Sequence, residues 1–526
     1  MRKGTMMRVL TGLLGAGATA LCLAAPAAAD VTPDQVWSDL RSYLETLGYE
    51  VEVEETASGG SLTLSGLSVT SDLPEEGGTS EVTLGTLILE DRGDGTVEVI
   101  LPEMLPIDTI VRPTGEQPVE IGLHYTSQGG EMIVSGTPED MRYSYSAASA
   151  ALDLVRLVAE GREVPRSEAS ARIEMGQTDS ETRVTTADGM RGYSQSSSIE
   201  DLAYDITLTD PETGGSGAFS GRFVDVTTTS GSEVPEDASG EDIAALVGAG
   251  FVSELAFRHE GSEGTFSFTE PAAPGPEGAA PGAPQTSSGS SSSTGGTLSG
   301  ALSDSGFRLE TSGTGVAYAM TGGDLPFPIS VSAEEMGFSL DLPLAADGRS
   351  QDMALGLTLD GLTLSDEIWG VFDPAAVLPR DPATLQIDLA GKVTPLVNVF
   401  DPEEMATLEA GDQPPAQLDA LTLRNLTLDA AGARVTGEGA FTFDNTDLQS
   451  FDGMPRPEGQ VELRVQGANA LLDRLIEMGL MTNEDAMGAR MMMSMFGVAG
   501  SEPDSLSSRI EVNGQGQVFA NGQRIR

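Results

Sequence analysis

The two histidines of the chain, His124 and His259, are the side chains best suited to metal binding or acid–base chemistry near neutral pH. A helical metal site places two histidines four residues apart, whereas each of these stands alone on a predicted strand. Carboxylates occur throughout the chain, so no pair can be singled out as acid and nucleophile. The sequence has no nucleophile-elbow, phosphate-binding or dinucleotide-binding motif. We therefore predict a non-enzymatic protein with no catalytic residue, no metal site and no cofactor.

A different chemistry is offered by a group of methionines in two predicted helices near the C-terminus. Methionine is flexible and polarisable, so a surface rich in it can adapt to varied apolar ligands. Three interpretations fit: helices that pack over a sheet, a lid over an apolar groove, and copper(I) binding through thioether sulfurs. If the helices form a lid, Met491 and Met495 are the predicted ligand contacts. The group consists of Met478, Met481, Met487, Met491, Met492, Met493 and Met495.

Three nearly identical nine-residue segments, at 62–70, 357–365 and 421–429, predict the strands that would position an apolar ligand. Each alternates apolar with polar residues, as a strand with one solvated face must. Each also changes phase at a glycine or asparagine, such as Gly66, residue types that tolerate a left-handed backbone. One extra residue at that point is typical of a β-bulge, which bends the strand and returns the leucines to one face. The leucines predicted to form this ligand-binding face are Leu64, Leu67, Leu359, Leu362, Leu423 and Leu426.

These strands predict a mainly β (α+β) fold with one or two long, curved antiparallel sheets and bulged strands. An N-terminal helix is expected to begin at Pro33, because Thr32 and Gln35 are placed to form a capping box. A C-terminal helical pair is expected within 468–496, with Thr482 capping its second helix. We expect these helices to pack on the apolar face of the sheet.

By composition, the chain divides into two β-rich halves, at 30–270 and 301–526. The segment between them, 271–300, is rich in Pro, Ala, Gly and Ser, and Glu277 is its only charged residue. Such a segment cannot bury enough apolar surface to order itself, so we predict that it is flexible. It is either an interdomain linker or a long loop within one continuous sheet.

The first 29 residues have the features of a secretory signal peptide. A basic start precedes an apolar stretch at 9–23, and three alanines ending at Ala29 supply the cleavage site. Cleavage there removes Cys22, the only cysteine, and leaves a mature chain without disulfide or thiolate. An uncleaved membrane anchor and a lipid-modified Cys22 are the alternatives. We predict a protein of the periplasm of a Gram-negative envelope, with no transmembrane segment in the mature chain.

The formal net charge of −53 limits the partners that this chain can have. An acidic surface of this size repels nucleic acid and anionic lipid head groups, so we expect no nucleic-acid partner. The acidity is most simply explained by solubility. Weak binding of divalent cations on carboxylate-rich loops is the alternative.

Several of these features together resemble a bacterial envelope family of unknown activity. They are the signal peptide, the capped helix, the leucine repeats, the apolar helix at 471–480 and the closing hairpin at 510–522. Over most of the mature sequence, the chain resembles the family described as domain of unknown function 2125. Its repeats are also distantly similar to those of AsmA-like envelope proteins, whose strands form apolar grooves implicated in lipid handling. The first family has no established activity, so the resemblance assigns no functional residue.

Two functions fit these features, and a hydrolase that uses scattered carboxylates is a third hypothesis that no motif supports. In the first, a periplasmic protein binds or shuttles an apolar, lipid-like ligand along its curved sheet. In the second, a structural or assembly protein of the envelope has a closed core and no ligand. The two differ in whether the repeat leucines line an open groove or pack in a core, and both arrangements produce the same sequence pattern.

Overall fold

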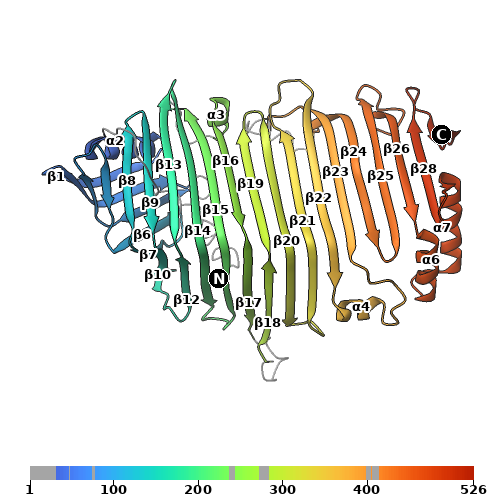
Figure 1. The fold of residues 1–526 in the computed structure, drawn as a ribbon, viewed down its shortest axis with the longest axis horizontal. Helices are drawn as coiled ribbons and strands as arrows, with labels where there is room; N and C mark the ends of the chain where they lie inside the picture. The colour runs from blue at the N-terminus through green and yellow to red at the C-terminus, as the bar shows by residue number, and fades with distance from the viewer. Residues whose placement is uncertain are drawn as a thin grey trace. The chain divides into compact units, whose positions relative to one another are not determined.

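A computed structural model of the chain describes residues 31–46, 48–73, 77–235, 243–271, 283–398, 404 and 414–526 (Figure 1). The predicted signal peptide at 1–29 lies outside the described residues. The chain separates into an N-terminal unit, 1–260 with 264–284, and a C-terminal unit, 261–263 with 285–526. Both units consist mainly of antiparallel strands, so the predicted mainly β fold is confirmed.

The N-terminal unit begins with one helix and continues as antiparallel strands, which pair both with neighbours in sequence and with more distant strands. The elements are α2 (Pro33–Thr46), β1 (Glu50–Ser58), β2 (Ser61–Asp72), β3 (Gly78–Leu84), β4 (Leu87–Asp91), β5 (Val97–Ile100), β6 (Met104–Pro113), β7 (Val119–Gln128), β8 (Glu131–Thr137), β9 (Asp140–Ala147), β10 (Ser149–Ala159), β11 (Arg162–Glu163), β12 (Ala169–Met175), β13 (Thr178–Ala187), β14 (Met190–Thr209), β15 (Ser216–Pro235), α3 (Ile243–Gly248), β16 (Val252–His259) and β17 (Gly261–Glu270).

Helix α2 begins where predicted because Thr32 and Gln35 cap it reciprocally. The Gln35 N–H donates to Thr32 Oγ1 at 3.3 Å, and the Thr32 N–H donates to Gln35 Oε1 at 2.9 Å. Two residues beyond the helix, Gly48 has a φ of 83°, which favours glycine. The predicted N-terminal helix and its capping box are therefore confirmed.

The core of the N-terminal unit lies between α2 and strands β1 to β6, β8 and β9. Leu64 and Leu67 of the first repeat are 1% and 2% exposed within it. Burying such side chains stabilises a fold by about 1.5–3 kcal/mol each. The buried residues are Val31, Val36, Trp37, Val51, Leu62, Leu64, Leu67, Leu87, Leu89, Val97, Leu105, Val134 and Met141.

A buried ion pair joins α2 to the sheet beneath it. Arg191 Nη2 of β14 lies 2.5 Å from Asp39 Oδ2 of α2, and both side chains are at most 12% exposed. Tyr143 of β9 donates its hydroxyl to Asp39 Oδ2 at 3.2 Å. The Arg191 guanidinium also lies 5.6 Å and 5.4 Å from the ring centroids of Tyr43 and Tyr193. Burial raises the pKa of the Tyr143 hydroxyl, so this side chain stays neutral beside the carboxylate.

The C-terminal unit continues with antiparallel strands and with three helices among its described residues. The predicted helical pair is confirmed as α6 and α7, which contact β25 and β28. The elements are β18 (Gln285–Ser293), β19 (Gly295–Ser303), β20 (Gly306–Gly322), β21 (Ile329–Pro343), β22 (Gln351–Leu364), α4 (Asp366–Phe372), β23 (Ala383–Pro395), β24 (Ala416–Ala430), β25 (Ala433–Asp444), β26 (Arg456–Gln466), α6 (Ala468–Glu477), α7 (Asn483–Phe496), β27 (Val498–Ala499), β28 (Ser505–Val512), β29 (Val518–Ala520) and β30 (Gln523–Arg524).

Strands β18 and β19 correct the prediction that 271–300 is flexible. Both strands pair antiparallel with β20, so that prediction is wrong from Gln285 onward. Order here comes from backbone hydrogen bonds to β20, which do not depend on apolar side chains. Hydroxyl pairs add to it, such as Thr297 Oγ1 and Ser312 Oγ at 2.7 Å. Residues 272–282 lie outside the described residues.

The predicted β-bulges are present in all three leucine repeats. The strand register shifts across Gly66 in the first repeat, beside Gly361 in the second and at 424–425 in the third. Gly66 and Gly361 have φ values of 61° and 65°, in the left-handed region where a Cβ is unfavourable. The bulges therefore occur where the apolar pattern changes phase.

Candidate functional site

The second and third leucine repeats lie on β22 and β24 and share one face of the C-terminal sheet. Directly opposed residues of antiparallel strands point to the same side, so the register shows which residues of β21 and β23 join them. We call this surface the leucine face. It consists of three rows: Leu340–Leu355–Leu389–Leu423, Phe338–Leu357–Ile387–Leu426 and Met336–Leu359–Leu385–Leu428.

The bulge in β24 is what keeps these rows apolar. Leu389 lies opposite Leu423, and Ile387, two residues earlier, lies opposite Leu426. Two residues of β23 therefore lie opposite three residues of β24. Because of the additional residue in β24, the side chain of Leu426 points to the same face of the sheet as that of Leu423. In β22 the equivalent shift places Leu362 opposite Ala383, beyond the edge of the three rows.

The leucine face is partly exposed over its whole extent. Met336, Leu357 and Leu428 are 44%, 37% and 44% exposed. The other nine side chains of the three rows are half-buried, and none belongs to the buried core. These residues thus form a broad apolar surface in which adjacent side chains shield one another only in part.

The opposite face of the same strands is polar and charged, as expected from the alternation of a strand. None of the twelve residues of the leucine face carries a charge. The sheet of the C-terminal unit is therefore amphipathic, with one apolar and one charged face. The ion pairs of the polar face include Lys392 with Asp352 at 2.7 Å, Arg308 with Asp341 at 2.7 Å and Arg424 with Asp388 at 3.6 Å.

The structure separates the eight residues predicted as a ligand-binding face into three places. Leu359, Leu423 and Leu426 lie on the leucine face, with Leu362 next to it. Leu64 and Leu67 are packed in the core of the N-terminal unit. Met491 and Met495 lie on the exposed side of α7.

Seven of the twelve residues of the leucine face lie outside the repeats and were missed by the sequence analysis. Its members on β21 and β23 include Phe338 and Ile387, which pair with β22 and β24 respectively. The alternation of apolar residues at 336–342 and 385–389 is the signal that could have revealed them. Alternation alone could not show which strands pair, because that depends on the tertiary register.

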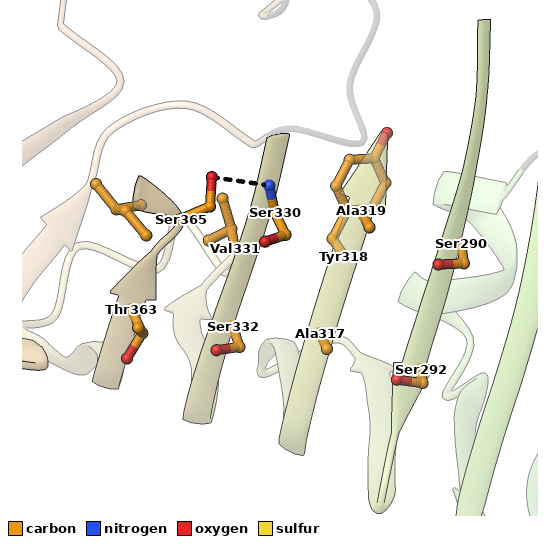
Figure 2. Close-up of a pocket in the computed structure, with 11 residues that line it drawn as sticks. Ser290, Ser292, Ala317, Tyr318, Ala319, Ser330, Val331, Ser332, Thr363 and Ser365 are labelled. Carbon is orange, nitrogen blue, oxygen red and sulfur yellow. Dashed lines mark hydrogen bonds between the residues drawn. The ribbon is translucent and has the colours of Figure 1, made fainter. Parts of the chain in front are cut away.

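A hollow of about 260 Å³ lies on β18, β20, β21 and β22 (Figure 2). Two rows of small residues line it, Ser292–Ala317–Ser332–Thr363 and Ser290–Ala319–Ser330–Ser365. The Ser330 N–H donates to Ser365 Oγ at 3.4 Å. A serine nucleophile requires an adjacent base, and this lining contains no histidine, lysine or carboxylate.

The two histidines do not form a chemical centre in the structure. His259 is buried against Phe223 and Phe257, with ring centroids 5.2 Å and 5.9 Å away. Its Nδ1 has no hydrogen-bond partner among the described residues. His124 lies on β7, opposite Asp153 of β10. Within the described part of the chain, no three His, Cys, Asp or Glu side chains are grouped so that they could hold a metal ion.

The helices of the described residues are at most 14 residues long, whereas crossing a bilayer requires about 20 predominantly apolar residues. None of them is both long enough and apolar enough to span a membrane.

Comparison with known families confirms the predicted resemblance over the C-terminal region. Residues 270–524 match the model of a family described as an uncharacterised protein conserved in bacteria, domain of unknown function 2125. The capped helix and the first repeat, which also suggested the resemblance, lie outside the matched range. The matched range contains the whole leucine face and helices α6 and α7. No curated protein and no solved structure matches the chain.

Proposed function

We propose that this protein binds or shuttles an apolar, lipid-like ligand on the leucine face, without catalysing a reaction. The proposal is supported chiefly by one observation, the partial exposure of three contiguous rows of large apolar side chains. Contiguous exposed apolar surfaces mark interaction sites in water-soluble domains, because leaving them in water is unfavourable.

The chemistry of the leucine face favours hydrocarbon over a polar ligand. Its side chains carry no charge and no hydroxyl or amide group that could bind a polar substituent. Four strands about 4.8 Å apart and three rows about 7 Å apart make the face roughly 14 Å wide in each direction. That size is sufficient for a segment of an acyl chain, while a polar head group would remain in water.

The proposed location is the periplasm, as the predicted signal peptide indicates. The family match is to proteins conserved in bacteria, which agrees with this proposal. Fractionation of cells that produce the full-length chain tests it. Recovery of the protein in the periplasmic fraction, beginning at Asp30, is expected, whereas recovery in the cytoplasm would contradict it.

Lipid bound to the protein can be measured directly. After gentle purification of the full chain, mass spectrometry should detect phospholipid or fatty acid above the level of a control protein purified in parallel. Placing a charge on the leucine face by Leu357→Glu or Leu428→Glu should remove most of that lipid, because an ionised carboxylate opposes contact with hydrocarbon.

Thr358→Glu and Thr427→Glu provide matched controls on the same two strands. Both positions lie one residue from the substituted leucine and on the polar face, opposite Gln386 of β23. These controls should retain the lipid. Equal lipid content in all four variants, or none in the unmodified protein, would exclude the leucine face as the binding site.

A structural or assembly role remains the alternative, and the N-terminal unit favours it. There the first repeat is packed in a core, as a protein without ligand requires. Loss of the gene would then weaken the envelope without changing its lipid composition. A protein that carries no lipid but whose deletion has this effect would support the structural role.

A further inference from the structure

The outward side of α7 is an apolar surface that the leucine face does not explain. We call it the methionine face. Its members are Met487, Met491, Met492, Met495 and Phe496, which are 67%, 64%, 56%, 54% and 36% exposed. The inward side of the helix is fixed by Ala486, which is completely buried. The four methionines lie on successive turns of the helix. Because their thioether side chains are flexible, they form a surface that can adapt to an irregular apolar partner.

This surface is uncharged although the chain as a whole is strongly acidic. Arg490 is the only charged residue between positions 486 and 498. Its side chain turns toward α6, where Nη2 lies 2.7 Å from Asp473 Oδ1 and Nε donates to Asn469 Oδ1 at 3.1 Å. The guanidinium is therefore paired on the side of the helix that faces α6, away from the methionine face. The methionine face presents hydrocarbon and sulfur only.

Helix α7, which carries the methionine face, also lies at the end of one apolar row of the sheet. The row containing Leu428 of the leucine face continues through Val435 and Val465 to Leu506 on β28. At that end, α7 runs into β27, which pairs with β28 at Leu506 and Ser507. Ser508 Oγ donates to the Phe496 carbonyl at 2.7 Å and holds the last turn of α7 there. Helix α7 lies beside β28 in the fold (Figure 1).

We propose that the methionine face docks the protein onto an uncharged or zwitterionic lipid surface, from which the leucine face receives its ligand. This inference rests on the proposed function. A lipid surface is favoured over a folded protein partner because the methionine face has no charged or hydrogen-bonding side chain that would orient a partner. A zwitterionic surface is favoured over an anionic one because acidic residues flank the methionine face, including Glu484 and Asp485 at the start of α7.

Vesicle flotation tests the docking step with the full-length mature chain. The protein should float with vesicles of phosphatidylcholine, and binding should fall when phosphatidylglycerol replaces half of the lipid. The variant Met487→Gln, Met491→Gln, Met492→Gln, Met495→Gln should bind phosphatidylcholine vesicles about tenfold more weakly, because the buried apolar area is lost. Glutamine is a good helix former, so circular dichroism should be unchanged.

Met454→Gln is the matched control, because Met454 is 65% exposed but lies in the loop between β25 and β26. This variant should bind vesicles as the unmodified protein does. Failure of the unmodified protein to float with phosphatidylcholine vesicles would overturn the docking proposal. Unchanged flotation of the fourfold variant would do the same.

A second measurement separates this inference from the proposed function. The rate at which a pyrene-labelled phospholipid moves from vesicles to the protein should fall about tenfold in the fourfold methionine variant, in proportion to its weaker docking. The amount loaded at equilibrium should stay the same, since the leucine face is intact. Unchanged rates with normal loading would refute docking alone, whereas absence of loading in every variant would refute the proposed function.

Discussion

The N-terminal unit buries its leucine repeat under a helix, whereas the C-terminal unit leaves its two repeats on a partly exposed sheet face. Leu64 is 1% exposed in the first repeat, and Leu357 is 37% exposed in the second. The strands are of the same kind, with a bulge at the same place in each repeat. The environments differ because α2 packs on β1, β2 and β4, while α6 and α7 contact β25 and β28.

The contacts that anchor the helices also differ between the two units. Helix α2 is anchored by the buried Arg191–Asp39 pair, with Tyr143 completing the contacts of the carboxylate. Helices α6 and α7 are joined by Arg490 and Asp473, whose side chains are 38% and 68% exposed. The comparison shows that one strand pattern can serve as a core or as an open surface, depending on what packs against it.

The largest expected difference between the units concerns truncation of a repeat leucine. Leu64→Ala should lower the free energy of unfolding of the N-terminal unit by about 3 kcal/mol or more, because it leaves a cavity in a packed core. Leu423→Ala on the leucine face should cost about 1 kcal/mol or less, since solvent already reaches that surface. The two tryptophans, Trp37 and Trp369, lie in different units and report unfolding of each by fluorescence.

The two values can be compared in urea titrations of single-tryptophan variants, with Trp369→Phe for the N-terminal unit and Trp37→Phe for the C-terminal unit. Equal losses at both leucines would show that the leucine face is packed as tightly as the core. That result would remove the principal support for ligand binding.

The next largest difference concerns the two arginines that hold helices. Arg191→Met should destabilise the N-terminal unit by about 3 kcal/mol, because Asp39 is left buried without its counter-charge. Arg490→Met should cost about 0.5 kcal/mol or less, since its pair with Asp473 is solvent-exposed. Urea unfolding monitored at Trp37 and Trp369 measures both. A large loss for Arg490→Met would mean that the helical pair is held more firmly than its exposure indicates.

A smaller effect is expected at the bulge glycines. Gly66→Ala should cost about 1–2 kcal/mol, because alanine is unfavourable at a φ of 61° and no atom within 4 Å opposes its Cβ. Gly361→Ala should cost more, since its Cβ would also come within 2.5 Å of the Glu334 side chain. Thermal unfolding of the two variants tests this order. Neutral substitutions at both positions would show that the bulges tolerate other backbone conformations.

The smallest expected effect is the dependence of stability on pH, which also differs between the two units. Hydrogen bonds from Thr446, together with Arg456, lower the pKa of Asp444 to about 2 from its ordinary value of 3.8. Its stabilising contribution to the C-terminal unit is therefore present above pH 3.8 and is lost as pH falls through about 2. In the N-terminal unit, burial raises the pKa of Tyr143, so its contribution is lost only as pH rises above its ordinary value of 10.

Acid titration followed at Trp369 measures the first of these contributions. Asp444→Asn should flatten the dependence between pH 4 and 2, because asparagine does not titrate. An unchanged acid profile in this variant would assign the loss of stability to other carboxylates.

Several features were predictable because they depend on local chemistry. The capping box at Thr32 and Gln35 required only residues three apart. The bulge at Gly66 was visible as a change of phase in the apolar pattern, since side chains alternate strictly along a strand. The order in 285–303 was not predictable, because it comes from backbone pairing with β20, and composition indicates only what side chains can bury.

The amino-acid sequence by itself determined which side of each strand is apolar, where the strands bend and where the capped helices begin. These are properties of residues close together in the chain, and the physics of alternation and capping is sufficient to specify them. Only the tertiary structure decided whether an apolar side is covered. Coverage depends on where a distant helix packs, so Leu64 is in a core while Leu426, in a segment with the same apolar pattern, remains partly open to solvent.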